Sequence, residues 1–184
     1  MLFRSGMSAA ASSAGMTAAR SRVTEYGDPL ANPNASFSLG FWLGDEGSGG
    51  YLGKTLVVKY MQEELPDDLS EKFSKKFQLT RIDLLGNAYK KPFPNRYFAG
   101  FSKFLFDNRN HPVAYQIIYE AFSVFLEKYV CKHPDYQKYK VHFTGSVAFY
   151  YNDILRRAAA EKGLTVRNIL ETPIAGLTLY HQQT

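Results

Sequence analysis

The sequence predicts an α/β fold, and two stretches carry this prediction. In the C-terminal part, residues 140–146 have the pattern of a short buried strand followed by a tight glycine turn, and residues 147–171 that of a helix followed by a second strand. In the N-terminal part, residues 36–41 alternate polar and apolar side chains, which is typical of a strand, and lead into a glycine-rich acidic stretch. The segment from about Leu65 to Lys132 is predicted to be a helical insertion in this fold.

Composition limits the classes of protein that the chain can represent. Its 184 residues, 45% of them hydrophobic, are enough for one domain with a true core. The net charge is +5, but lysines and arginines are interspersed with acids except at the start of the chain, so we predict no nucleic-acid partner. No apolar run approaches the roughly 20 residues of a membrane span. The single cysteine, Cys131, cannot form an internal disulfide, which favours a cytoplasmic location.

The first 22 residues are rich in alanine and serine, contain arginine and lack acids. Three interpretations compete: a targeting peptide, a disordered tail, and a sequence that is not native or comes from a truncated gene. We treat residues 1–22 as a disordered or non-native start and residues 23–184 as the domain.

The acidic stretch runs from Leu43 to Lys54 and combines five glycines with Asp45 and Glu46. Glycine lets a backbone turn tightly and approach a ligand, and a carboxylate can accept hydrogen bonds from sugar hydroxyls or hold a metal. A helix starting at Ser48 or Gly49 would add free N–H groups. The alternative is a glycine-rich turn whose acids only cap that helix.

Helical periodicity then dominates as far as Lys132. Apolar side chains at spacings of three and four predict five helices, and Pro66 and the segment 92–94 separate some of them. Thr80 is the expected N-cap of the third helix. The predicted helices span Gly50–Glu64, Leu69–Phe77, Arg81–Tyr89, Asn95–Asn108 and Val113–Lys132.

A polar turn at residues 134–138 precedes the strand Lys140–Phe143. The helix Val147–Lys162 follows the turn, with Gly163 as its C-terminal glycine, and a second strand begins at Leu164. A glycine turn between a strand and a helix can present N–H groups to a phosphate. The histidines have no ligand spacing among themselves or with Cys131, so we predict no metal site from this chain.

The motifs resemble those of a known family. Residues 44–48, Gly-Asp-Glu-Gly-Ser, are similar to a segment of the N-acetylglucosamine kinase and BadF/BadG/BcrA/BcrD ATPase group of the actin-like superfamily. Residues 93–96, 145–148 and 173–177 agree with that group at fitting spacings. The resemblance covers about residues 23–181 and is closest to short kinase-like members from bacteria.

The resemblance implies that the chain is the C-terminal lobe of an actin-like (ribonuclease H-like) ATPase or sugar kinase. It implies that Asp45 hydrogen-bonds sugar hydroxyls, with Ser38, Leu39 and Gly40 forming backbone contacts beside it. It also implies that Gly145 and Ser146 contact the adenosine of ATP, although the family has a second glycine at the position of Ser146. The general base, the first phosphate loop and the acid that holds Mg²⁺ would lie in an N-terminal lobe, so we assign no catalytic residue here.

The function implied is ATP-dependent phosphorylation of N-acetylglucosamine or a related amino sugar in carbohydrate metabolism, with ATP and Mg²⁺ as cofactors. This chain alone is expected to be inactive, and the family suggests a homodimer. One alternative is an ATPase that activates a dehydratase, although a single cysteine fits its shared iron–sulfur cluster poorly. Another is a non-catalytic protein that binds a sugar or a nucleotide.

Overall fold

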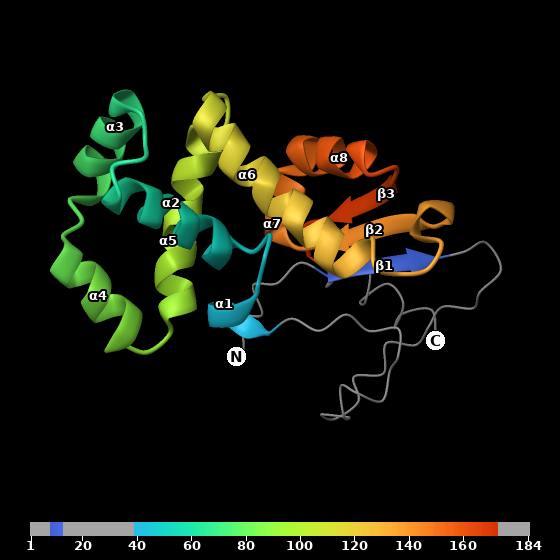
Figure 1. Cartoon of the computed structure of the whole chain (residues 1–184), viewed down its shortest axis with the longest axis horizontal. Helices are drawn as coiled ribbons and strands as arrows, with labels where there is room; N and C mark the ends of the chain where they lie inside the picture. The colour runs from blue at the N-terminus through green and yellow to red at the C-terminus, as the bar shows by residue number, and fades with distance from the viewer. Residues whose placement is uncertain (1–7, 13–38, 173–184) are drawn as a thin grey trace. The chain divides into compact units, whose positions relative to one another are not determined.

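The computed structural model of the chain describes residues 8–12 and 39–172. They form two compact units. The first unit is Gly40–Phe122, and the second contains residues 8–12, Leu39 and residues 123–172. Each unit has its own arrangement of elements, visible in Figure 1.

The first unit is helical. The predicted helices within it are confirmed to within a few residues. Thr80 caps the helix Arg81–Tyr89 by accepting a hydrogen bond from the Asp83 N–H at 3.1 Å. Its elements are α1 (Gly40–Leu43), α2 (Gly49–Met61), α3 (Asp67–Phe77), α4 (Arg81–Tyr89), α5 (Pro94–Asp107) and the start of α6 (Pro112–Phe125).

Aromatic side chains fill the core of the first unit. Phe73 of α3 is fully buried, and its ring lies 4.4–5.8 Å, centroid to centroid, from the rings of Tyr60, Phe77, Phe101 and Phe104. Edge and tilted contacts of this kind add to the free energy of burying the rings. Phe98, Phe101, Phe104 and Leu105 face inward from α5.

Helices α2 and α5 approach each other closely because α2 carries glycine where they meet. A Cβ atom on Gly53 would lie 1.8 Å from the carbonyl oxygen of Phe98, so no larger side chain fits at this backbone separation. A Cβ atom on Gly50 would lie 3.4 Å from the carbonyl oxygen of Asn95. The glycines of the acidic stretch therefore serve helix packing as well as turning.

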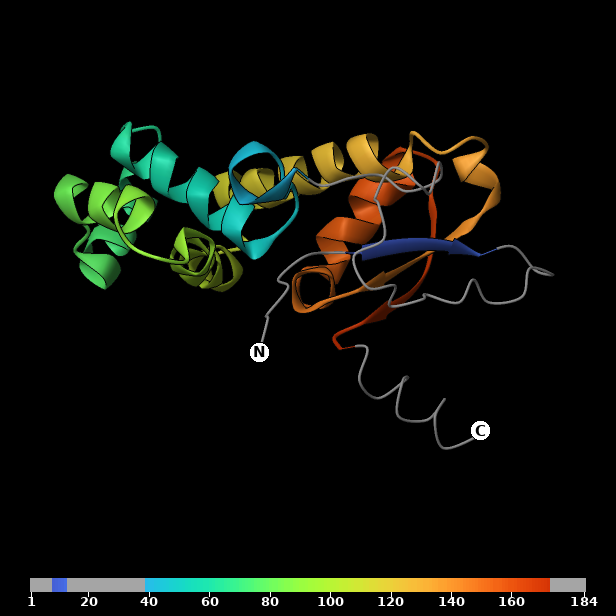
Figure 2. The same ribbon diagram turned by 90° about the horizontal axis from the view of Figure 1, so that it is seen from below.

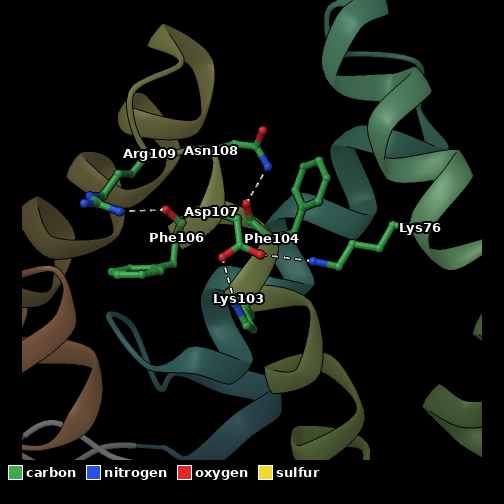
Figure 3. A network of polar contacts seen from close by, with 7 residues as sticks. All are labelled: Lys76, Lys103, Phe104, Phe106, Asp107, Asn108 and Arg109. Carbon is green, nitrogen blue, oxygen red and sulfur yellow. Dashed lines mark hydrogen bonds and ion pairs between the residues drawn. The ribbon is translucent and has the colours of Figure 1, made fainter.

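The surface of the first unit carries an ion-pair network at the end of α5 (Figure 3). Asp107 accepts hydrogen bonds from Lys103 at 2.8 Å and from Lys76 of α3 at 3.1 Å. The Lys76 ammonium also lies 5.9 Å from the centroid of the Phe104 ring. The network links α3 to α5 above the aromatic core.

The strand predicted over residues 36–41 is wrong in its described part. Gly40 and Phe41 lie in α1, and Gly40 starts that helix with a φ of 77°. The Phe41 ring packs on Gly50 and lies 5.6 Å from the Phe98 ring. These tertiary contacts override the local alternation of polar and apolar residues.

The second unit contains a three-stranded sheet in the order β1-β2-β3 (Figure 2). β2 (Lys140–Thr144) pairs in parallel with β3 (Thr165–Leu170), with an irregularity between Val141 and Phe143. β1 (Ser8–Ser12) pairs antiparallel with β2. The prediction of a disordered or non-native start did not anticipate this strand, whereas β2 and β3 confirm the predicted strands.

Two helices connect β2 to β3. They are α7 (Ser146–Tyr150) and α8 (Asn152–Glu161), where the sequence predicts one helix over Val147–Lys162. The helix breaks at Tyr151, which is buried and has a φ of −108° and a ψ of 28°. Gly163 follows with a φ of 71°, as expected for a C-terminal glycine. Both helices contact β3.

The end of the longest predicted helix also differs from the prediction. α6 ends at Phe125, and Leu126–Val130 continue as a π-helix in which the Cys131 N–H donates to the Leu126 carbonyl at 2.8 Å. A 3₁₀ turn at Tyr136–Lys138 then leads to β2. Phe125, Leu126 and Val130 are buried and supply part of the core of the second unit.

Candidate functional site

The acidic bend, defined here as Gly44–Ser48, lies between α1 and α2 in the first unit. Asp45 has a left-handed φ of 68°, which aspartate tolerates better than most residues, and Gly47 has a φ of 76°. The Ser48 N–H donates to the Asp45 carbonyl at 3.1 Å. The bend is thus a tight turn that ends directly in α2.

Ser48 fixes the Asp45 side chain. Its hydroxyl donates to Asp45 Oδ2 at 2.7 Å and accepts from the Tyr51 N–H at 3.0 Å, which makes Ser48 the N-cap of α2. The Ser48 side chain is fully enclosed, with 1% of its surface exposed. The carboxylate of Asp45 is therefore held in one orientation by a buried hydroxyl and not by a solvated contact.

Asp45 itself is half-buried. Burial raises the pKa of the Asp45 carboxyl above its ordinary value, while the hydrogen bond from Ser48 and the charge of Lys54 act in the opposite direction, and Glu46 adds to the rise. Glu46 is buried beside it, at 7% exposure. A partly enclosed, oriented carboxyl that still reaches solvent can accept hydrogen bonds from a polyhydroxylated ligand.

Lys54 also belongs to this site, although the sequence did not predict a role for it. Its ammonium donates to the Phe41 carbonyl at 3.2 Å and lies 5.0 Å from the centroid of the Phe41 ring. A lysine on an amphipathic helix usually lies on the solvated face. Lys54 instead contacts a backbone carbonyl thirteen residues earlier, which its local sequence does not indicate. The only signal in the sequence was its place one turn beyond Gly50.

The other residues predicted to contact the sugar are only partly covered by the described structure. Ser38 lies outside the described residues. Leu39 is exposed, and Gly40 starts α1. α1 is only four residues long, and the N–H of Gly44, which precedes Asp45, donates to the Gly40 carbonyl at 2.9 Å.

The predicted nucleotide contacts, Gly145 and Ser146, lie in the second unit, where Gly145 separates β2 from α7 and Ser146 is the first residue of α7. Gly145 has a φ of 140° and a ψ of 151°, a conformation that favours glycine. Its N–H donates to the Leu170 carbonyl at 2.8 Å, which ties the turn to the end of β3. The side chain of Ser146 is exposed. The strand, glycine turn and helix occur in the predicted order.

Other candidate chemistry is limited. Residues 8–12 and 39–172 contain no group of three histidine, cysteine or acidic side chains that could hold a metal ion. No helix in these two ranges has the length and apolar character needed to cross a membrane. Cys131 is half-buried, and burial raises the pKa of its thiol, so it is a poor nucleophile at neutral pH.

The fold is similar to that of a sugar kinase structure. In particular, the chain matches a crystal structure from Porphyromonas gingivalis that is described as a putative N-acetylglucosamine kinase. The match has 37% sequence identity and a TM-score of 0.75 and covers 79% of this chain. It confirms the resemblance to N-acetylglucosamine kinases predicted from the motifs.

The chain spans about half of that protein, since the match covers 51% of the P. gingivalis chain. No family model and no curated protein matches the sequence. The comparison therefore supports the fold and the sugar-kinase class of protein. It does not by itself show what the whole protein does.

Proposed function

We propose that the chain is part of an ATP-dependent sugar kinase that phosphorylates N-acetylglucosamine or a related amino sugar. The observation that carries the proposal is the match, at 37% identity, to a structure described as a putative kinase for this sugar. The oriented carboxylate at the start of α2 supports it independently, because it offers an acceptor of the kind that sugar hydroxyls need.

Within this proposal, Asp45 accepts hydrogen bonds from the sugar hydroxyls. Ser48 holds the carboxylate from one side at 2.7 Å, which leaves its remaining acceptor sites for the ligand. The backbone of Ser38, Leu39 and Gly40 completes the contacts. Positioning of this kind is a main source of catalysis in phosphoryl transfer, because the protein contributes little covalent chemistry.

ATP and Mg²⁺ are the proposed cofactors. The turn at Gly145 and Ser146 is the proposed contact for the adenosine of ATP. Mg²⁺ would neutralise the charge on the phosphates. We assign neither a metal ligand nor the general base to the described side chains, and we propose that another part of the kinase supplies them.

The proposal is tested by titration calorimetry of the purified chain with N-acetylglucosamine. We expect binding by the wild type and a loss of at least about tenfold in affinity for Asp45→Asn, because a charge-assisted hydrogen bond is about twice as strong as a neutral one. Asp135→Asn is the matched control, since Asp135 also has a left-handed φ, of 57°, but is exposed and lies in the second unit.

Turnover separates the proposed kinase from a simple binding protein. The chain alone should not consume ATP when N-acetylglucosamine is added. A full-length relative that carries the same Asp45→Asn change should lose phosphorylation of the sugar. Sugar binding without turnover in the full-length protein would contradict the kinase proposal, and equal sugar affinity in Asp45→Asn and the wild type would remove Asp45 from the site.

A further inference from the structure

Lys54 links the elements on both sides of the acidic bend. Its side chain starts on α2, after the bend, and its ammonium donates at 3.2 Å to the Phe41 carbonyl of α1, before the bend. The same ammonium lies 5.0 Å from the Phe41 ring centroid and 5.8 Å from that of Tyr51. A cation over an aromatic ring is attracted to its face, so three contacts favour this one position.

The Phe41 carbonyl needs such a donor. The chain leaves the helical conformation at Asp45, whose φ is 68°, so this carbonyl lies at the C-terminal end of α1. Carbonyls at a helix C-terminus lack partners within the helix and interact favourably with a cation. The lysine therefore terminates α1 at the place where the bend begins.

The backbone at Lys54 is held by the packing of its helix. Its neighbour Gly53 packs against the Phe98 carbonyl so closely that the backbones of α2 and α5 are in direct contact at this point. Gly50, one turn earlier, lies under the Phe41 ring, where a Cβ atom would be 3.3 Å from the ring carbons. Phe41 is thus held by its ring on Gly50 and by its carbonyl on Lys54.

We propose that Lys54 is a positioning residue of the sugar site, which anchors α1 to α2 on both sides of the acidic bend and lets its positive charge act on Asp45. This inference rests on the proposed function of Asp45 in binding the sugar. The charge matters because an ionised carboxylate is a stronger acceptor of hydroxyl protons than a neutral carboxyl.

The electrostatic surroundings of Asp45 agree with this role. Burial raises the pKa of the Asp45 carboxyl, and the negative charge of Glu46 raises it further. The Ser48 hydroxyl and the Lys54 ammonium lower that pKa. Without the lysine, two influences that favour the neutral carboxyl would be opposed only by the hydrogen bond from Ser48.

The test compares Lys54→Met, Lys54→Gln and Lys54→Arg with the wild type. Methionine keeps the apolar stem, glutamine keeps a donor for the Phe41 carbonyl without the charge, and arginine keeps both. Lys59→Met is the control, because Lys59 lies on the same helix but pairs with Glu64 at 3.0 Å. The first readout is the titration of the Asp45 carboxyl carbon by NMR in the absence of ligand, and the second is the affinity for N-acetylglucosamine.

We expect Lys54→Met and Lys54→Gln to raise the pKa of Asp45 and to weaken sugar binding about fivefold, the effect of one partly exposed charge pair. Lys54→Arg should restore both values, and Lys59→Met should change neither. A merely structural role would not move the Asp45 titration in the folded glutamine variant.

Wild-type behaviour of Lys54→Gln and Lys54→Met in both readouts would overturn the inference. Absence of sugar binding by the wild type would instead count against the proposed function. In that case the NMR titration still decides whether Lys54 controls the charge of Asp45.

Discussion

The two units of this chain differ in what their glycines contribute. In the first unit, Gly53 has ordinary helical geometry and is needed because a neighbouring backbone is too close for a side chain. In the second unit, Gly145 and Gly163 have positive φ values of 140° and 71° and are needed for the path of their own backbone. The first unit thus uses glycine for contact between helices as well as for turns, at Gly40 and Gly47, whereas Gly145 and Gly163 of the second unit are needed for turns.

The two units also differ in the side chains that fill their cores. The first unit surrounds Phe73 with aromatic rings contributed by several helices. The second packs aliphatic and alanine side chains of α8, among them Leu155, Ala158 and Ala159, in a unit built on a parallel pair of strands. The first core thus centres on one phenylalanine surrounded by rings, whereas the part of the second core that α8 contributes is aliphatic.

The largest predicted effect follows from replacing Gly53 by alanine. The new methyl group would overlap the Phe98 carbonyl and force α2 away from α5, at a cost of about 3 kcal/mol in the free energy of unfolding. Denaturant unfolding measures this loss, and hydrogen exchange should show it mainly in residues 40–122.

Gly100→Ala provides the control for this change. Gly100 lies in α5, in the same unit, with open space where its Cβ would be, so alanine there should stabilise the protein by about 0.5–1 kcal/mol. If Gly53→Ala were as stable as the wild type, the contrast between the two units would be wrong.

The second effect concerns Gly145 in the other unit. Alanine would have to adopt a φ of 140°, which costs about 2 kcal/mol. Hydrogen exchange should show the loss mainly in residues 140–170. Ser146→Ala, an exposed neighbour, should leave stability unchanged, and exchange that rises equally in both units would contradict this assignment.

A smaller effect is expected for Lys76→Met in the network of Figure 3. The hydrogen bonds from Lys103 and Lys76 lower the pKa of the Asp107 carboxyl below its ordinary 3.8, so the network stabilises the folded state only while that carboxyl is ionised. The variant should lose about 0.5 kcal/mol at neutral pH. The difference should disappear as the pH falls through the lowered pKa, and thermal unfolding at several pH values measures it.

The smallest effect, of opposite sign, is predicted for Asp45→Asn. Burial raises the pKa of Asp45, so ionisation disfavours the folded state, and removing the charge should stabilise the protein slightly at neutral pH. The gain should vanish as the pH falls through the raised pKa, where the wild-type carboxyl becomes neutral. Greater stability in parallel with weaker sugar binding would indicate a residue kept for function, whereas a loss of stability at neutral pH would contradict the prediction.

Much of the fold could be predicted because local signals and tertiary packing agree. Thr80, the prolines and the three- and four-residue spacing locate α2 to α5 within a few residues. The strand β2, the turn at Gly145 and the glycine after α8 are equally clear in the sequence. The position of Asp45 in the turn that leads to the N-cap of α2 also followed from the sequence.

The remainder depends on contacts between distant residues. Residues 36–41 have the alternation of a strand, but Phe41 packs on Gly50 and belongs to a helix. The break at Tyr151 and the π-helix at Leu126–Val130 carry no composition signal. Lys54 could not be assigned because its partner is a carbonyl group whose position only the folded chain defines.

The close packing of α2 on α5 has a consequence for any molecule that meets the acidic bend. The bend leads into a helix whose backbone lies directly against that of α5, and its carboxylate is oriented by an enclosed hydroxyl. Its conformational entropy is therefore lost when the protein folds and not when a complex forms. A ligand should therefore bind to the acidic bend without a large change in the protein. Selectivity among ligands should arise from the stereochemistry of the hydroxyl groups that they present to the Asp45 carboxylate.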